Sequence, residues 1–227
     1  MLFRSGLLHH KFCVFDETIV LTGTWNPTTR GSYKHDNVVL LIESPRIAQS
    51  YLHEYGLLAA RKGMEVAHDD SYDQVNLSGA LIDICMSQQA DCETVIIRAL
   101  QEANHSIDML AFTFTSEGVG DALVRAHQRG VDVHVIFEKT RITRYSQYER
   151  LASVNITVSV DGNRHVMHEK IIIIDNQTVL LGSYNPTSSA RERNDENLLL
   201  IRQDTGLATA MAEEFTRIRA ESVHEDS

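Results

Sequence analysis

Residues 168–185 of the chain read HEKIIIIDNQTVLLGSYN, and residues 9–26 read HHKFCVFDETIVLTGTWN. Both stretches contain the same motif, H-x-K-x4-D-x6-G-S/T-x-N. The two copies align without a gap, and the match continues through the apolar runs at 39–42 and 198–201. A match of this length indicates an internal repeat. We therefore expect two related lobes that each carry one motif.

The motif side chains suit the chemistry of a phosphodiester. In an H-x-K strand the histidine and the lysine lie two residues apart and face the same side. Two such strands, related by a pseudo-twofold axis, bring two imidazoles and two ammonium groups around one pocket. Lysines stabilise negative charge in the transition state, and asparagine amides donate hydrogen bonds to the same oxygens. The candidate catalytic residues are His9, Lys11, Asn26, His168, Lys170 and Asn185.

The paired motifs resemble those of the phospholipase D superfamily. The resemblance implies an α/β fold of two pseudo-twofold-related lobes, each a mixed sheet flanked by helices. It also implies metal-independent hydrolysis through a phosphohistidine, with no cofactor and no metal site. The substrate it implies is a phosphodiester of a phospholipid or of a nucleic acid. In the family an acidic residue at the position of Glu196 hydrogen-bonds the motif histidine, and Asn37, the equivalent residue of the first repeat, departs from that pattern.

This asymmetry suggests different roles for the two histidines. We expect Glu196 to hold His168, because a carboxylate raises the pKa of an imidazole and favours its protonated form. His168 would then be the general acid and His9, without a carboxylate, the nucleophile. Family precedent for a nucleophile in the first motif points the same way. Thr24 and Ser183 either contact the substrate or stabilise their turns.

Other motif and near-motif residues have simpler expected roles. Asp16 and Asp175 lie an odd number of residues from the lysines, so we interpret them as structural turn residues. His10 is expected to face away from His9. A basic stretch that includes Lys139, Arg141, Arg144 and Arg150 lies where ligands often bind in α/β folds, and it either attracts phosphates or is a solvated helix face.

The chain divides by pattern into three parts. Residues 1–63 are expected to form the C-terminal part of a first lobe, 64–90 a linker with a short strand near 80–84, and 91–222 a complete second lobe. We expect the first lobe to be truncated, since about 75 residues of β-α-β-α-β pattern precede His168 and eight precede His9. The pattern predicts strands at 9–15, 18–22, 37–42, 107–114, 131–137, 156–160, 178–181 and 197–201, a loop at 23–34, and helices at 45–61, 92–103, 118–129, 143–152 and 207–220.

Composition restricts the remaining possibilities. The 227 residues carry a formal net charge of −10, which argues against a wholly basic nucleic-acid binder. No apolar run approaches the roughly 18 residues of a membrane span. Residues 1–8 are too short for a signal peptide, so we do not expect one here. The three cysteines are predicted to be buried or free thiols in a reducing compartment. Without a signal peptide, the cytoplasm is the expected location.

Three readings of the function stay open at this point. The first is a phospholipase D-like phosphodiesterase, and the second is a non-specific endonuclease of the same superfamily. The third is a weakly catalytic phosphate-binding module, because the first lobe lacks its early strands and helices. A monomer or a homodimer is compatible with the sequence, and each chain already carries both motifs.

Overall fold

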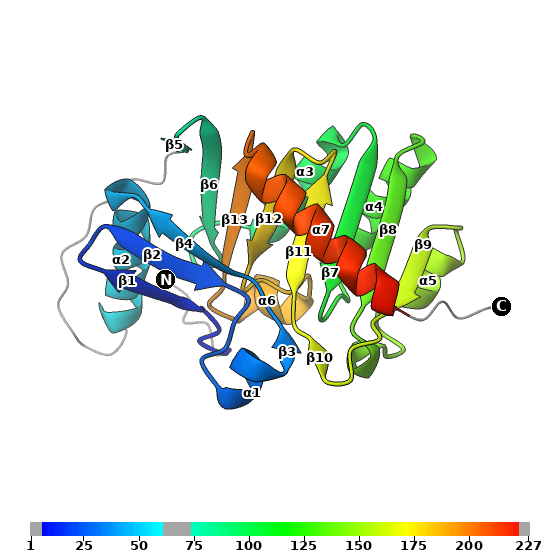
Figure 1. The fold of residues 1–227 in the computed structure, drawn as a ribbon, viewed down its shortest axis with the longest axis horizontal. Helices are drawn as coiled ribbons and strands as arrows, with labels where there is room; N and C mark the ends of the chain where they lie inside the picture. Colours follow the sequence, from blue (N-terminus) through cyan, green and yellow to red (C-terminus); the bar gives the residue numbers. More distant parts are fainter. Residues whose placement is uncertain (1–5, 61–73, 223–227) are drawn as a thin grey trace.

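The chain forms two unequal lobes, each built around its own sheet (Figure 1). The computed structural model describes residues 6–60 and 74–222. The small lobe contains a three-stranded sheet in the order β1-β2-β4. Its elements are β1 (Phe12–Phe15), β2 (Ile19–Gly23), α1 (Thr29–Tyr33), β3 (His35–Asp36), β4 (Val39–Glu43) and α2 (Pro45–Ala60).

The large lobe contains an eight-stranded mixed sheet in the order β5-β6-β13-β12-β11-β7-β8-β9. Its strands are β5 (Val75–Leu77), β6 (Ala80–Met86), β7 (Ser106–Ala111), β8 (Asp132–Phe137), β9 (Thr157–Val160), β11 (Lys170–Ile174), β12 (Thr178–Gly182) and β13 (Asn197–Arg202). Its helices are α3 (Cys92–Glu102), α4 (Glu117–Gln128), η1 (Lys139–Arg141), α5 (Tyr148–Ala152), α6 (Ser188–Glu192) and α7 (Thr205–Glu221). A short parallel pair, β10 (Val166–Met167) with β3, joins the lobes.

The repeat seen in the sequence is a repeat of structure. Strands β1, β2 and β4 and helices α1 and α2 match β11, β12, β13, α6 and α7 in the same order. The motif glycines show why this backbone is specific: Gly23 has φ 143° and Gly182 has φ 156°. A Cβ at Gly23 would lie 2.2 Å from the carbonyl oxygen of Val38, and one at Gly182 would lie 2.4 Å from that of Asn197. Only glycine allows both the torsion and the close approach.

The structure differs from the predicted elements in three places. The described part of the predicted linker, residues 74–90, contributes β5 and β6, and β6 pairs along its length with β13 of the large sheet. Residues 64–73 of the predicted linker lie outside the described residues. The predicted loop at 23–34 contains α1, which Thr28 caps by accepting from the N–H of Gly31. The predicted helix at 143–152 is only α5, because hydrogen bonds between Thr143 and Ser146 form a turn instead.

The prediction of three free cysteines is wrong. Cys85, at the end of β6, and Cys92, at the start of α3, form a disulfide, and Cys13 is free and exposed. Cys92 lies seven positions after Cys85, so the bond closes the short connection between a strand and a helix. The sequence contains no C-x-x-C pair, and spacing alone did not indicate that these two side chains would meet.

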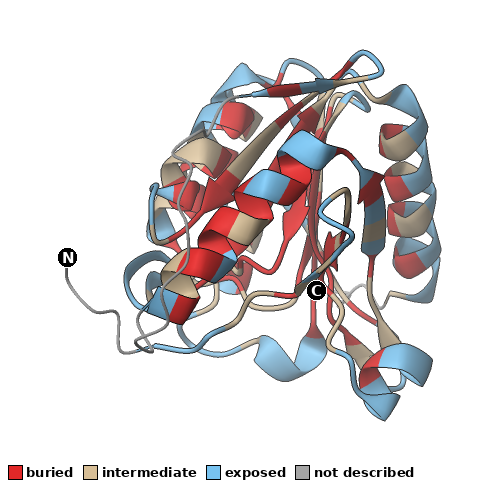
Figure 2. Ribbon diagram, turned by 90° about the vertical axis from the view of Figure 1, so that its left-hand side faces the viewer, coloured by how far each residue is buried: buried red, intermediate tan, exposed pale blue. Residues whose placement is uncertain are grey.

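The two long helices are amphipathic. Helix α2 has 16 residues and α7 has 17, and each packs one side against a sheet. Figure 2 shows the helices with buried residues along one side and exposed residues along the other. Among the helices of the described ranges, none combines the length and the hydrophobicity that crossing a membrane requires.

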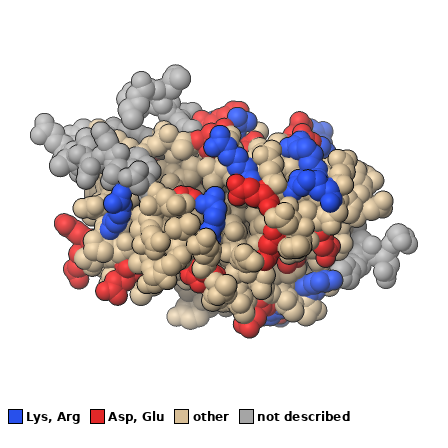
Figure 3. Space-filling model, turned by 90° about the horizontal axis from the view of Figure 1, so that it is seen from above, with Lys and Arg blue, Asp and Glu red and all other residues tan. Residues whose placement is uncertain are grey.

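Charges of both signs are mixed on the face at the top of Figure 1, which Figure 3 views directly. Lys and Arg side chains lie beside Asp and Glu side chains over this face. Arg202, at the end of β13, contacts Asp83 in this way. Interspersed charges produce no extended field of one sign, so this face is a poor candidate for binding a charged ligand.

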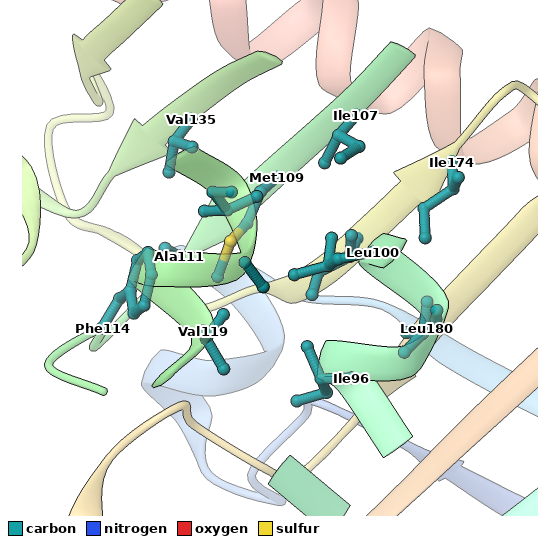
Figure 4. Packing of buried hydrophobic residues seen from close by; sticks show 14 of the residues in the cluster. Ile96, Leu100, Ile107, Met109, Ala111, Phe114, Val119, Val135, Ile174 and Leu180 are labelled. Atoms are coloured by element: carbon teal, nitrogen blue, oxygen red, sulfur yellow. The ribbon is translucent and has the colours of Figure 1, made fainter. Parts of the chain in front are cut away.

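Two hydrophobic clusters lie on opposite faces of the large sheet. One packs α3 and α4 onto β7, β8, β11 and β12, and Figure 4 shows Ile96 and Leu100 of α3 against Met109, Ile174 and Leu180. The other is shared by the lobes and includes Ile47 and Tyr51 of α2 with residues of α7 and the motif strands. Complete burial of such side chains contributes roughly 1.5–3 kcal/mol each. The shared cluster therefore fixes the lobes relative to each other.

The motif aspartate of the large lobe stabilises the sheet. Asp175 has φ 53°, and its carboxylate accepts the backbone N–H groups of Asn104, His105 and Ser106 at 2.9, 2.7 and 2.9 Å. Partial burial opposes ionisation, but these donors outweigh it and lower the pKa of Asp175. Asp16 occupies the same turn with φ 48° and is exposed, and in the described ranges β1 has no strand equivalent to β7 beside it.

We therefore predict that Asp175→Asn destabilises the protein by about 1–2 kcal/mol, since the amide offers one acceptor oxygen and no charge. Urea-induced unfolding measures the change. The contribution of the wild-type carboxylate is present above its unfolded pKa and is lost as the pH falls through its lower folded pKa, so the difference should shrink in acid. Asp16→Asn is the matched control and should change stability by less than about 0.5 kcal/mol. Equal losses in both variants would contradict this role of Asp175.

Candidate active site

The lysine of each motif folds back onto its own histidine. Lys11 Nζ donates to the backbone carbonyl of His9 at 2.8 Å, and Lys170 Nζ donates to that of His168 at 2.7 Å. Lys170 lies on β11, whereas Lys11 precedes β1. The backbone N–H of His9 donates to the carbonyl of Asp195, which holds the segment before β1 in place. The two motifs therefore present their side chains in the same way despite different local structure.

The two motifs meet between the lobes. The backbone N–H of His168 donates to the carbonyl of Asp36 in the small lobe, and that of His9 donates to the carbonyl of Asp195 in the large lobe. Lys11 and His9 are close enough to His168 to affect its ionisation. The structure thus brings together the four predicted His and Lys side chains at the end of the molecule where α1 and α6 lie (Figure 1).

Each motif histidine is anchored by the opposite lobe. Nδ1 of His9 lies 2.7 Å from Oε2 of Glu196, which is completely buried. Nδ1 of His168 lies 3.0 Å from Oδ1 of Asn37. The prediction that Glu196 holds His168 is therefore wrong. It assumed that a histidine is held by the residue of its own repeat, whereas pairing of the lobes exchanges the partners.

Asn37 and Glu196, which we call the anchors, are themselves fixed by hydrogen bonds. Asn37 Nδ2 donates to the carbonyls of Gly31 and His35 at 3.0 and 3.3 Å, which turns its oxygen toward His168. Glu196 accepts from Ser183 Oγ at 2.7 Å and from Asn194 Nδ2 at 3.1 Å. An oxygen at each anchor makes Nδ1 of both rings the proton-bearing nitrogen and leaves Nε2 for chemistry.

Thr24 and Ser183 lie behind the anchors. Both side chains are fully buried. Thr24 Oγ1 donates to Asn37 at 3.2 Å and accepts from the N–H of Val38, while Ser183 accepts from the N–H of Asn197. Of the two roles open to these residues, this arrangement supports positioning of the anchors over contact with a substrate.

Burial and mutual repulsion shape the charges of the site. Burial, followed by the charges of Lys170 and Lys11, lowers the pKa of His168 to about 2. Burial also lowers the pKa of Lys11 to about 8, although Glu196 opposes the shift, and it lowers that of Lys170 with a contribution from Lys11. Positive groups crowded into a partly dry site bind an anion strongly, because the anion relieves their repulsion.

The sequence analysis missed two residues at the site. Phe112, just after β7, lies with its ring centroid 4.5 Å from that of His168 and 4.6 Å from Lys170 Nζ. Ser87 accepts the backbone N–H of Glu196 at 2.8 Å. The signal for Phe112 is its place at the carboxyl end of a strand, where ligand sites are common. Nothing in the pattern around Ser87 indicated a role.

The remaining residues in and near the motifs lie in different surroundings. Asn26 and Asn185 follow the motif glycines and are half-buried, and Oδ1 of Asn185 has no hydrogen-bond partner among the described residues. His10 faces away from His9, as predicted, and pairs with Glu54 of α2 at 2.8 Å. Tyr184 is buried and Trp25 donates to Ser32 at 3.2 Å within its turn.

Comparison with known proteins agrees with this geometry. The family model described as "Cardiolipin synthase, PLD-like domain" matches residues 1–56 and 96–219. Phospholipase D of Rickettsia typhi is 33% identical over 155 residues, which cover 67% of this chain and 76% of the relative.

Solved structures show the same likeness. A phospholipase D family member, Nuc from Salmonella typhimurium, aligns with a TM-score of 0.62 and 30% identity over 65% of this chain and 99% of its own. Phosphatidylserine synthase of Haemophilus influenzae shares the fold with a TM-score of 0.73 over 96% of this chain and 62% of its own, at 16% identity. By its paired motifs, its fold and these matches, the chain belongs to the phospholipase D superfamily.

Proposed function

We propose that the chain hydrolyses phosphodiester bonds, with His9 as the nucleophile and His168 as the general acid. The observation that carries the proposal is the crossed anchoring of the two rings, His9 by Glu196 and His168 by Asn37. It fixes two imidazoles, one from each lobe, beside two buried lysines. A fixed pair of this kind allows nucleophilic attack and proton donation on the same phosphate.

In the first step Nε2 of His9 attacks phosphorus. The bond from phosphorus to the leaving alcohol oxygen breaks, and His168 gives that oxygen a proton. Lys11 and Lys170 stabilise the negative charge on the non-bridging oxygens, and the amides of Asn26 and Asn185 donate to the same oxygens. The product of this step is a phosphohistidine at His9 and a neutral alcohol.

In the second step His168 accepts a proton from water. The water oxygen attacks phosphorus, the bond between phosphorus and Nε2 breaks, and His9 and His168 return to their starting forms. The two lysines supply the positive charge that a metal ion supplies in other phosphodiesterases. We therefore propose a metal-independent reaction.

The roles follow from the anchors. Bonding to phosphorus places positive charge on the imidazole of His9, and the carboxylate of Glu196, 2.7 Å away, stabilises that charge. His168 has only the neutral amide of Asn37, and burial, followed by the charges of the two lysines, disfavours its cationic form. A bound phosphodiester offsets the lysine charges and favours protonation of the ring, which then gives up its proton readily. The sequence analysis assigned the same roles from a different, incorrect pairing.

A phospholipid is the first substrate class that we propose. Relatives named phospholipase D and the match to a cardiolipin synthase domain support it. The phosphodiester chemistry applies equally to nucleic acid, which is the second class. A phosphate-binding module without turnover is the third reading, and it predicts no product from any phosphodiester.

The two histidines should be distinguishable by the step that each variant blocks. The wild-type chain should hydrolyse bis(p-nitrophenyl) phosphate in excess EDTA, and His9→Ala and His168→Ala should each lower steady-state turnover by about 10²–10⁴-fold. Release of p-nitrophenolate needs no proton, so His168→Ala should still give a burst of one equivalent and retain a phosphoryl adduct on His9. Mass spectrometry of the trapped enzyme locates the adduct. A burst from His9→Ala, or an adduct on His168, would reverse the roles, and inhibition by EDTA would exclude the metal-free reaction.

The second prediction concerns Lys11. Because the pKa of Lys11 is lowered to about 8, its charge is lost as the pH rises through that value. The kcat/KM for hydrolysis should therefore fall above about pH 8. Lys11→Arg keeps its charge at any accessible pH, so the variant should lose this alkaline limb even if its maximal rate is lower. A wild-type profile that is flat to pH 9.5, or an identical limb in the variant, would contradict the assignment.

The third prediction concerns the neutral anchor. Asn37→Asp places a carboxylate on Nδ1 of His168 and should raise the pKa of that ring by about one to three units from its value of about 2. NMR titration of labelled histidine measures the change without reference to activity. Asn37→Ala is the control, since it removes the hydrogen bond and adds no charge. An unchanged pKa in Asn37→Asp would show that Asn37 does not anchor His168 in solution.

A further inference from the structure

Five exposed cations cluster beside the active site. They come from α1, η1 and the loop that precedes β10, and together with His35 and His165 we call them the basic rim. The cations of the basic rim are Arg30, Lys34, Lys139, Arg141 and Arg164. His165 lies among them, since Lys34, Arg164, His35 and Arg30 all act on its ionisation. Such a concentration of positive charge is unexpected in a chain with a net charge of −10.

The basic rim adjoins His168 on two sides. The ring of His35 lies 6.3 Å from that of His168, and His35 pairs with Val166 in the short parallel β3–β10 pair. On the other side, Arg141 Cζ lies 4.8 Å from the centroid of Phe112. The same ring contacts His168 and Lys170, so one aromatic side chain lies between these two motif residues and Arg141.

Three acids near the basic rim, of which Glu138 and Asp161 are buried and Asp36 is half-buried, accept hydrogen bonds from the protein. Glu138 is fully buried and accepts from the N–H groups of Met167 and Thr140 at 2.8 and 3.0 Å. Asp161 accepts from the N–H of Asn163 at 2.9 Å, and Asp36 accepts from Arg217 at 2.8 Å. These contacts fix the loops from below, while the cations face solvent above.

The rim cations are not neutralised by ion pairs. Within residues 6–60 and 74–222, no rim cation forms a salt bridge, whereas Arg191 pairs with Asp91 and Glu93, and Arg150 pairs with Asp121. The face at the opposite end of the molecule mixes both signs (Figure 3). The basic rim is thus a part of the described surface beside the site where several positive charges stand together without an ion pair.

We propose that the basic rim is a second phosphate-binding subsite. It takes a non-reacting phosphate of a substrate that carries at least two, while the lysines and histidines hold the reacting one. The guanidinium of Arg141 suits this task, because it can donate two parallel hydrogen bonds to one phosphate. Phe112 sets the spacing between the two phosphates. The inference rests on the proposed function for the reacting phosphate, and it adds a preference among substrates.

Two synthetic substrates test the basic rim. Thymidine 3′-(p-nitrophenyl phosphate) carries one phosphate, and its 5′-phosphorylated form carries a second. We expect the wild-type chain to prefer the second form by about 10-fold in kcat/KM, mostly through a lower KM. Arg141→Gln and Arg164→Gln should remove most of this preference and leave the one-phosphate substrate within twofold. Arg98→Gln, the same change at an exposed arginine of α3, should preserve the preference.

The outcomes separate the subsite from the reaction. Equal kcat/KM for the two substrates in the wild type, or equal losses in Arg98→Gln, would overturn the subsite. Calorimetry with thymidine 3′,5′-bisphosphate and thymidine 3′-phosphate measures binding in parallel, so the subsite is tested even if neither substrate is hydrolysed. There too we expect tighter binding of the bisphosphate, weakened by Arg141→Gln, and equal affinities would contradict the proposal. Failure of hydrolysis alone counts against the proposed function and not against the subsite.

The source of the second phosphate is tested with the same variants. Single-stranded oligonucleotides offer a neighbouring backbone phosphate, and vesicles of cardiolipin offer a second phosphate in the same lipid, with phosphatidylglycerol vesicles of equal charge as the comparison. Loss of turnover in Arg141→Gln on the strand alone identifies a nucleic-acid source, and loss on cardiolipin alone identifies a lipid source. No loss on either would contradict a role for the basic rim.

Discussion

The crossed anchoring of the two histidines is the interaction on which the site depends. His9 belongs to the small lobe and is held by Glu196 of the large one, and His168 is held by Asn37 in the reverse direction. Neither ring has its partner until the lobes dock. The shared hydrophobic cluster around Tyr51 and the buried amide of Asn197, which donates to Tyr51 and Thr22, therefore stabilise the fold and assemble the site in one step. Stability and activity are coupled through one interface.

Docking of the two lobes also explains why the pKa values of the buried lysines and of His168 are lowered. The same burial that orders the lobes removes water from Lys11, Lys170 and His168, and it disfavours their charged forms. Burial and crowding therefore disfavour the charged forms of these groups, and a bound anion would favour them. Protein contacts already hold the side chains in place, which is preorganisation.

The fold class and most of the candidate site could be predicted from the sequence, because the two copies of the motif align without a gap and place equivalent residues at equivalent positions. The motif spacing indicated the His and Lys pairs, the glycine turns and the α/β lobes. The crossing of the anchors could not be predicted, since spacing along a chain does not say which lobe supplies the nearest side chain. Tertiary contacts likewise determine that β6 joins the large sheet by pairing with β13. They also bring Cys85 and Cys92 together as a disulfide. Thr143 shows a local competition, in which side-chain hydrogen bonds stop a helix that periodicity favours.

Because both motifs lie in one chain, the two halves of the site can differ in sequence. In a homodimer every substitution appears twice, so the two halves of a symmetric site change together. Here one anchor is a carboxylate and the other an amide at equivalent positions of the repeat. A ligand entering such a centre meets two distinguishable sides. Duplication within a single polypeptide thus lets the two halves of one site diverge.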